Sequence, residues 1–197
     1  MISVYNIKPK FQQLLRPILA FFHKNGISPN AITWMAIVLS FVVGALFYWK
    51  PNGFMLIVLP LSLLVRMALN ALDGMMAKTY NLQSKSGEIL NELGDVVSDV
   101  FLYLPLILLN GLHPMILISF VVLGIINEFS GVLAKAITGE RRYDGPMGKS
   151  DRALMIGLCL LGLFFFPQIN VALNYIFGTS ILLLVISTGS RIKNTLK

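Results

Sequence analysis

The stretch RMALNALDGMMAKTYNLQSKSGEILNELGDVVSDV, residues 66–100, lies between strongly apolar segments of the chain. It contains five of the nine acidic residues: Asp73, Glu88, Glu92, Asp95 and Asp99. The whole chain of 197 residues is 56% hydrophobic and 13% charged. Soluble domains have roughly 45–50% apolar and about 25% charged residues. The composition therefore predicts an integral membrane protein that gathers its carboxylates in one place.

Apolar segments long enough to cross a hydrocarbon core of about 30 Å, which takes roughly 20 helical residues, recur along the chain. They lie near residues 31–49, 54–77, 88–109, 114–137, 151–166 and 171–190. A basic amphipathic segment over about residues 1–28 precedes them and is typical of a helix lying on the membrane surface. We expect an all-α, polytopic membrane protein: one membrane domain over residues 1–197, with six transmembrane helices after an N-terminal interfacial helix.

The basic residues indicate the orientation of these helices. With the N-terminus inside, fourteen of the sixteen Lys and Arg residues fall on or near the inner side. Lys50 falls outside and Arg66 lies within a predicted span. The positive-inside rule then predicts that both termini and the acidic stretch are cytoplasmic. The same rule accounts for the net charge of +7, which is therefore no evidence of nucleic-acid binding.

The acidic stretch is hard to explain as structure alone, because a charge at the bilayer centre costs about 2.5–3.5 kcal/mol. Helical periodicity places Glu88, Asn91, Glu92, Asp95 and Asp99 on one face of the predicted third helix. Asn70 and Asp73 share a face of the second, and the short connection predicts that the two faces oppose each other. Oxygen ligands without nearby His or Cys suit Mg²⁺ or Mn²⁺, which bridge phosphate oxygens.

The spacing of this stretch matches a known pattern. Asn70-x-x-Asp73-Gly74-x-x-Ala77-Lys78, eight residues, then Gly87-x-x-x-Asn91-x-x-x-Asp95 resembles the signature of the CDP-alcohol phosphotransferases, also called CDP-alcohol phosphatidyltransferases. That signature is D-x-x-D-G-x-x-A-R, eight residues, G-x-x-x-D-x-x-x-D. Residues 26–33, before the first span, are also similar to the family, so the resemblance covers effectively the whole chain.

The resemblance implies a membrane transferase of phospholipid biosynthesis. Such enzymes move a phosphatidyl or similar substituted phosphoryl group from CDP-diacylglycerol or a similar CDP-lipid to a small alcohol and release CMP. Similar proteins are commonly dimers, which implies a homodimer here. The sequence leaves the acceptor open, with a lean toward a phosphorylated alcohol.

The resemblance also implies roles for single residues. In the family pattern the Asp residues hold two divalent cations, Mg²⁺ or Mn²⁺, on the pyrophosphate, and the last Asp is also the general base. Asp95 would then be the catalytic base, and Asp73 a ligand of metal and nucleotide. The metal positions would be Asn70, Asp73, Asn91 and Asp95. The CDP-lipid pocket would be lined by Gly74, Ala77, Lys78 and Gly87.

Three positions depart from the pattern: Asn70 and Asn91 replace Asp, and Lys78 replaces Arg. The two Asn residues remove two negative charges, although the amide oxygen can still coordinate a metal. Either one metal is enough, or Glu88, Glu92 and Asp99 restore the charge. Because these three acids share the Asp95 face, we expect the second.

Basic residues near the predicted fourth connection suggest an acceptor pocket. Lys149 and Arg152 end the sequence YDGPMGKSDR, and Arg141 and Arg142 precede it. These residues form either an ordinary basic cytoplasmic loop or a phosphate cradle. Glu128 in the preceding span is either a paired buried carboxylate, with a partner such as Arg66, or a wall of the acceptor pocket.

Three classes of function fit these features. The first is the membrane transferase, and the second is a degenerate family member that binds CDP-lipid or metal without turnover, as Asn70 and Asn91 suggest. The third is an ion transporter, but a carrier more typically places a broken helix near mid-membrane. The retained Asp73 and Asp95 favour the transferase.

Overall fold

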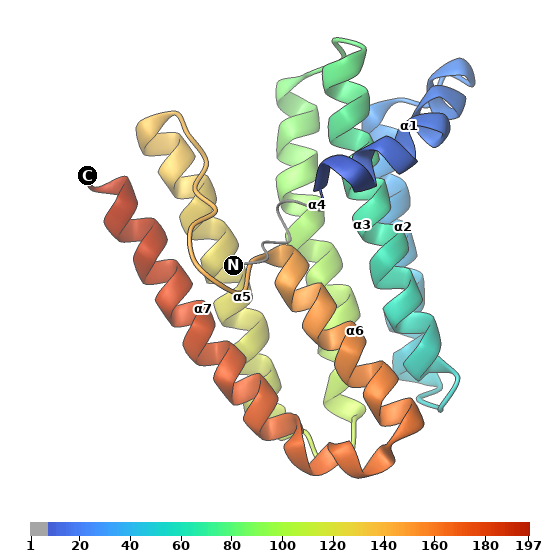
Figure 1. The fold of residues 1–197 in the computed structure, drawn as a ribbon, viewed down its shortest axis with the longest axis vertical. Helices are drawn as coiled ribbons and strands as arrows, with labels where there is room; N and C mark the ends of the chain where they lie inside the picture. Colours follow the sequence, from blue (N-terminus) through green and yellow to red (C-terminus); the bar gives the residue numbers. More distant parts are fainter. Residues whose placement is uncertain (1–7) are drawn as a thin grey trace.

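The computed structural model describes residues 8–197, and these residues form a bundle of helices (Figure 1). The α-helices are α1 (Lys8–Lys24), α2 (Pro29–Trp49), α3 (Met55–Thr79), α4 (Lys85–Tyr103), α5 (Pro114–Thr138), α6 (Lys149–Phe165) and α7 (Leu173–Thr195). Short 3₁₀ segments, η2 (Leu104–Leu108) and η3 (Pro167–Ala172), follow α4 and precede α7. The predicted all-α class is confirmed.

Local capping sets where two of the central helices begin. The Ser28 hydroxyl accepts a hydrogen bond from the Ala31 amide at 3.2 Å, and Pro29 takes the first position of α2. The Ser84 hydroxyl accepts from the Gly87 amide at 3.0 Å and caps α4. These caps start the helices that carry the polar residues of the signature region.

Four helical stretches in the described part of the chain are long and apolar enough to cross a membrane. They are Pro29–Trp49, Met55–Thr79, Pro114–Thr138 and Pro167–Thr195. The other two predicted spans are helical as well, but α4 carries four acidic residues and α6 has only 17 residues. By length and composition alone, the structure supports four spans.

Most helix bounds differ from the predicted ones by a few residues, and α7 continues to Thr195, beyond the predicted end at 190. The segment predicted at 88–109 begins earlier, at Lys85, and its α-helix ends at Tyr103. Pro105 is the reason, because proline has no amide hydrogen for the helical ladder and clashes with the preceding turn, so a 3₁₀ segment follows. Of the predicted interfacial segment, Lys8–Lys24 is helical, and residues 1–7 lie outside the described residues.

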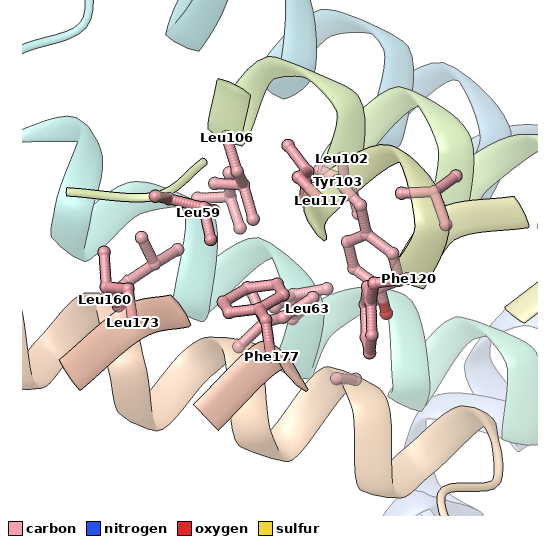
Figure 2. Close-up of a cluster of buried hydrophobic side chains, with 14 of the residues drawn as sticks. Leu59, Leu63, Leu102, Tyr103, Leu106, Leu117, Phe120, Leu160, Leu173 and Phe177 are labelled. Atoms are coloured by element: carbon pink, nitrogen blue, oxygen red, sulfur yellow. The ribbon is translucent and has the colours of Figure 1, made fainter. Parts of the chain in front are cut away.

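The bundle is held by an apolar core in its lower half and a smaller cluster near α1. The larger core joins Leu59 and Leu63 of α3 to Leu102, Phe120 and Phe177 of α4, α5 and α7 (Figure 2). The smaller one packs the apolar face of α1, with Leu15 and Leu19, on Leu72 and Met76 of α3. For helices that cross a membrane, such contacts stabilise the bundle mainly by close packing, because lipid chains are as apolar as leucine.

The connections between helices gather at the two ends of the bundle (Figure 1). The α3–α4 turn and the C-terminal ends of α5 and α7 lie at the upper end in that view, and the α2–α3, α4–α5 and α6–α7 connections lie at the lower end. The upper end therefore brings together the halves of α3 and α4 that carry the signature residues.

Candidate active site

A cleft with a volume of about 560 Å³ opens where the first turns of α2 and α4 meet the last turns of α3. Its lining includes most of the predicted pocket residues: Asp73, Gly74, Ala77, Lys78, Gly87 and Asn91. Lys85 and Lys135 add positive charge to the same lining. The predicted opposition of the α3 and α4 faces is therefore present in the structure.

Asp73 lies buried at the wall of this cleft, with 4% of its surface exposed. Its Oδ2 accepts a hydrogen bond from the Thr33 hydroxyl of α2 at 2.9 Å. Gly74 follows it on α3, and a Cβ atom added at Gly74 would meet no other atom within 4 Å. The cleft is thus open beside a carboxylate that α2 holds in a single orientation.

Asp95 accepts hydrogen bonds from two other helices. The Asn70 side-chain amide of α3 donates to Asp95 Oδ1 at 2.7 Å. The ammonium group of Lys149, the first residue of α6, contacts Asp95 Oδ2. Asp95 is buried, whereas 27% of the Lys149 side chain is exposed. A carboxylate has about four lone-pair sites, so Asp95 retains acceptor capacity for a further proton donor.

The three additional acids of the α4 face each have a basic partner. Glu88 pairs with Lys135 at the exposed rim, and Glu92 pairs with Arg141. Asp99 lies deeper, with its Oδ1 2.5 Å from Arg66 and its Oδ2 2.8 Å from Arg152. Their negative charges are therefore balanced by the protein itself.

Glu128 of α5 extends these pairs into one network. It contacts Arg141 at 2.8 Å and Arg152 at 3.1 Å. The network joins Arg66, Arg141 and Arg152 to the same number of acids: Glu92, Asp99 and Glu128. Its formal charge is zero, and it links α3, α4, α5 and α6 next to the cleft, whose lining includes Glu92.

No group of three or more His, Cys, Asp or Glu side chains within residues 8–197 is arranged to hold a metal ion. Asn at two of the four signature positions leaves Asp73 and Asp95 as the carboxylates of the predicted ligand set. Asp73 and Asn91 line the cleft, and Asn70 lies one helical turn before Asp73; their oxygen atoms are the types of donor that one such cation would take. A second cation on Asp95 fits less well, because Asn70 and Lys149 already contact both of its oxygens.

The sequence as a whole matches a family model, that of the CDP-alcohol phosphatidyltransferases, over residues 26–187. The chain belongs to this family. It is 41% identical over 194 residues to the inner membrane protein YnbA of Escherichia coli (strain K12), a match that covers 98% of this chain and 96% of YnbA. With its four apolar helices, this CDP-alcohol phosphatidyltransferase family member is an integral membrane protein.

The fold is shared with solved structures of one enzyme, the phosphatidylinositol phosphate synthase PgsA1 of Mycobacterium tuberculosis. The structure of PgsA1 with CDP-DAG bound has a TM-score of 0.77 and 19% identity, and the match covers 93% of this chain and 94% of that one. The structure of PgsA1 with manganese and citrate also has a TM-score of 0.77, with 18% identity and coverage of 92% and 88%. At these identities the likeness establishes the fold.

The predicted acceptor residues of this family member are brought close together, but most of them contact acids. Lys149 contacts Asp95, and Arg141 and Arg152 belong to the ion-pair network. Arg142 instead donates to the Asn194 carbonyl of α7 at 3.2 Å. Glu128 is a paired buried carboxylate, and the suggestion of Arg66 as its partner is wrong, because Arg66 extends from α3 toward Asp99.

The loop that carries these residues is anchored on α7. The Asp144 carbonyl accepts hydrogen bonds from the Ser187 hydroxyl at 3.0 Å and from Arg191 at 3.3 Å. Gly145 has a φ of +89°, and a Cβ atom there would lie 2.6 Å from the Ser187 Cα. Arg191 was given no site role from the sequence, because a basic residue near a terminus that is predicted to be cytoplasmic is explained by the positive-inside rule.

Two other residues of the cleft were given no role from the sequence. Thr33 orients Asp73, and Lys135 of α5 reaches the rim. Thr33 is a hydroxyl residue near the start of the largely apolar α2, and this position is the available sequence clue. Lys135 has no comparable clue, because its approach to α4 depends on how α5 packs.

Proposed function

We propose that this protein is a CDP-alcohol phosphatidyltransferase that moves a phosphatidyl group, or a similar substituted phosphoryl group, from CDP-diacylglycerol or a similar CDP-lipid to an alcohol and releases CMP. One observation carries the proposal. Asn70 of α3 bonds to Asp95 of α4 beside the cleft that most of the other signature residues line. Family membership supports it, as does the shared fold with PgsA1, whose structure contains CDP-DAG.

The donor would lie in the cleft, with its cytidine and pyrophosphate against α3 and α4. Lys78 and Lys85 supply positive charge for the pyrophosphate, and Gly74 and Ala77 leave room for it. A Cβ atom at Gly87 would lie 2.7 Å from Asn30 Oδ1, so glycine allows the first turns of α2 and α4 to approach. A bound Mg²⁺ or Mn²⁺ on Asp73, Asn70 and Asn91 would neutralise the pyrophosphate and stabilise CMP as it leaves.

Asp95 is the proposed general base. It takes the proton of the acceptor hydroxyl, whose oxygen then forms a bond to the phosphorus atom that carries the diacylglyceryl group. The bond from that phosphorus to the bridging oxygen of CMP breaks, and CMP departs with the electron pair. Asn70 and Lys149 orient the carboxylate, so the proton acceptor is in place before the alcohol arrives.

The membrane arrangement is part of the proposal. α4 joins the four apolar helices as a span, because its buried acids Asp95 and Asp99 face basic partners inside the bundle. α6, with 17 residues, is about 26 Å long and reaches most of the way across the hydrocarbon core. α1 would lie on the cytoplasmic surface, since Leu14 and Phe21 remain exposed while Leu15 and Leu19 pack on α3.

In this arrangement both termini and the cleft are cytoplasmic, as the positive-inside count predicts. The predicted homodimer is part of the same proposal. Light scattering of the detergent-solubilised protein, corrected for detergent mass, measures the mass of the assembly and tests it.

The acceptor is the open part of the proposal. The basic residues suggested for a phosphorylated acceptor are largely neutralised by Asp95, Asp99, Glu92 and Glu128. The acceptor panel must therefore include neutral alcohols as well as phosphorylated ones.

The test is incubation of the purified protein in lipid nanodiscs with CDP-diacylglycerol, a divalent cation and single alcohols. Mass spectrometry follows CMP and the new phospholipid, which should appear in equal amounts with at least one alcohol. The Asp95→Asn protein is the control for contaminating activity. Binding of CDP-diacylglycerol without CMP release from any alcohol would contradict the transferase and support the second candidate, a non-catalytic CDP-lipid binder, which Asn70 and Asn91 favour.

A further inference from the structure

We infer that the ammonium group of Lys149 provides, at Asp95, the positive charge of a second metal ion, so that the site binds one divalent cation. The inference rests on the proposed function, because it concerns the same cleft. It differs from the arrangement that the family signature implies, in which four Asp residues hold two cations.

The contact between Asn70 and Asp95 is the first observation. Asn70 Nδ2 lies 2.7 Å from Asp95 Oδ1. An Asp residue at position 70 would bring two carboxylates together at this point, and they would repel each other unless a cation joined them. The amide of Asn70 donates a hydrogen bond instead, so this pair of side chains is stable without a metal ion between them.

The contact between Lys149 and Asp95 is the second observation. Lys149 reaches Asp95 Oδ2, the oxygen that Asn70 leaves free. Each carboxylate oxygen of Asp95 therefore has a donor of its own from the protein. A cation that coordinated Asp95 would have to displace the Lys149 ammonium group and would then lie close to it. Only 10% of the Asp95 side chain is exposed, so water screens the repulsion between these two positive charges weakly.

Lys149 is held in this position by its surroundings. The Gly148 amide before it donates to Asp151 Oδ2 at 3.1 Å, which fixes the start of α6. One turn later, Arg152 is anchored by Asp99 and Glu128. On the other side, the loop is tied to α7 through the Asp144 carbonyl. The start of α6, and with it the backbone of Lys149, is thus fixed within reach of Asp95.

The charges of the neighbouring acids complete the argument. Glu88, Glu92 and Asp99 are the residues that the sequence suggested for restoring the lost charge, and each is paired with Lys135, Arg141 or the Arg66–Arg152 pair. One divalent cation, the Lys149 ammonium group and the Lys78 and Lys85 side chains of the cleft lining already match or exceed the negative charge of Asp73, Asp95 and a pyrophosphate. A second divalent cation would add an excess of positive charge.

The test is the number of Mn²⁺ ions bound per protein chain. Purified protein in nanodiscs with saturating CDP-diacylglycerol and no acceptor alcohol is titrated with Mn²⁺, and free Mn²⁺ is measured by electron paramagnetic resonance. Nanodiscs with CDP-diacylglycerol but no protein give the background to subtract. We expect one bound Mn²⁺ for the natural sequence. Two bound ions, or none, would overturn the inference.

Variants separate Lys149 from a general charge effect. In Asn70→Asp/Asn91→Asp/Lys149→Met, the signature carboxylates return and the ammonium group is removed, so two Mn²⁺ ions should bind. Asn70→Asp/Asn91→Asp, which restores the carboxylates but keeps the ammonium group, should still bind one. Lys193→Met, which removes an exposed lysine from the end of α7, should also bind one. If the triple variant, checked for folding by its thermal transition in detergent, binds only one ion, Lys149 does not occupy the second cation position.

The measurement is independent of turnover, so the two proposals can fail separately. Absence of CMP release together with one bound Mn²⁺ would refute the transferase and leave this inference standing. Release of CMP with two bound Mn²⁺ ions would do the reverse.

Discussion

At the scale of single residues, the two remaining signature carboxylates have different surroundings. Asp73 faces the cleft and is held by one hydroxyl, from Thr33. Asp95 is held by an amide and an ammonium group from two other helices. A residue held at the cleft wall is suited to binding the donor, and one held from two sides is suited to positioning a proton acceptor. Substitutions should separate the two roles.

Asp95→Asn removes the proposed base while keeping the shape of the side chain. We expect turnover to fall by about 10²–10⁴-fold, the usual contribution of a general base, with CDP-diacylglycerol affinity largely unchanged. Asp73→Asn should weaken donor binding itself. CMP release and donor binding are measured on the same preparations. Equal loss of donor affinity in both variants would contradict the assignment of Asp95 as the base.

Gly74→Ala tests whether the donor uses the open space beside Asp73. A Cβ atom at Gly74 meets no protein atom within 4 Å, so the thermal stability of the variant should stay nearly the same. The added methyl group narrows the cleft and should weaken CDP-diacylglycerol binding. Gly189→Ala is the matched control, since its Cβ atom also meets nothing within 4 Å and it lies on α7, away from the cleft lining. Unchanged donor affinity in Gly74→Ala would place the donor elsewhere.

At the scale of helices, buried ion pairs join α3, α4, α5 and α6. The apolar core joins the same helices in the lower half of the bundle. Arg66 of α3, Asp99 of α4 and Arg152 of α6 form one line of contacts, and Glu128 adds α5. The stability of the bundle depends on every buried charge keeping its partner, because a buried charge without one is strongly unfavourable.

Asp99→Asn should therefore destabilise the protein. It leaves Arg66 and Arg152 without their shared carboxylate, and removing one member of a buried pair costs about 3–5 kcal/mol. Glu88→Gln is the control, because its pair with Lys135 is exposed and such pairs contribute about 0–1 kcal/mol. Thermal unfolding in detergent compares the two. A similar transition temperature for both variants would show that the Asp99 network does not hold the helices together.

At the scale of the whole molecule, the proposed function requires the end of the bundle with the cleft to face the cytoplasm. The α3–α4 turn and the C-terminal ends of α5 and α7 share that end (Figure 1). CDP-linked lipids present their nucleotide at the membrane surface, so the cleft must open at the same level. The orientation of the entire bundle thus decides whether the donor can reach Asp73.

Reporter fusions test this orientation. A reporter at Asn52 or Asn110, in the α2–α3 and α4–α5 connections, should be external, and one at Asp144 should be cytoplasmic. Cysteine labelling with a membrane-impermeant reagent at the same positions gives an independent measurement. A cytoplasmic Asn52 would invert the bundle and remove the basis for a cytoplasmic cleft.

Much of the architecture is determined by local sequence. Long apolar runs have no alternative to helices in a membrane, because each backbone polar group must be satisfied within its own segment. The N-cap residues Ser28 and Ser84 set where α2 and α4 begin, and Pro105 sets where α4 ends. The spacing from Asn70 to Asp95 also predicts which faces of two adjacent helices meet, since the connection between them is short.

Contacts between distant segments were decided only by the tertiary structure. The local sequence does not indicate that Lys149 contacts Asp95 or that Thr33 donates a hydrogen bond to Asp73. It also does not indicate that Arg66 pairs with Asp99 and not with Glu128. Charges in a low-dielectric interior take whichever opposite charges the packing of helices brings nearest, and that packing depends on side chains along the whole bundle. The sequence by itself determined the helices, the family and most of the signature residues that line the cleft. The tertiary structure decided which of those charged residues are already paired.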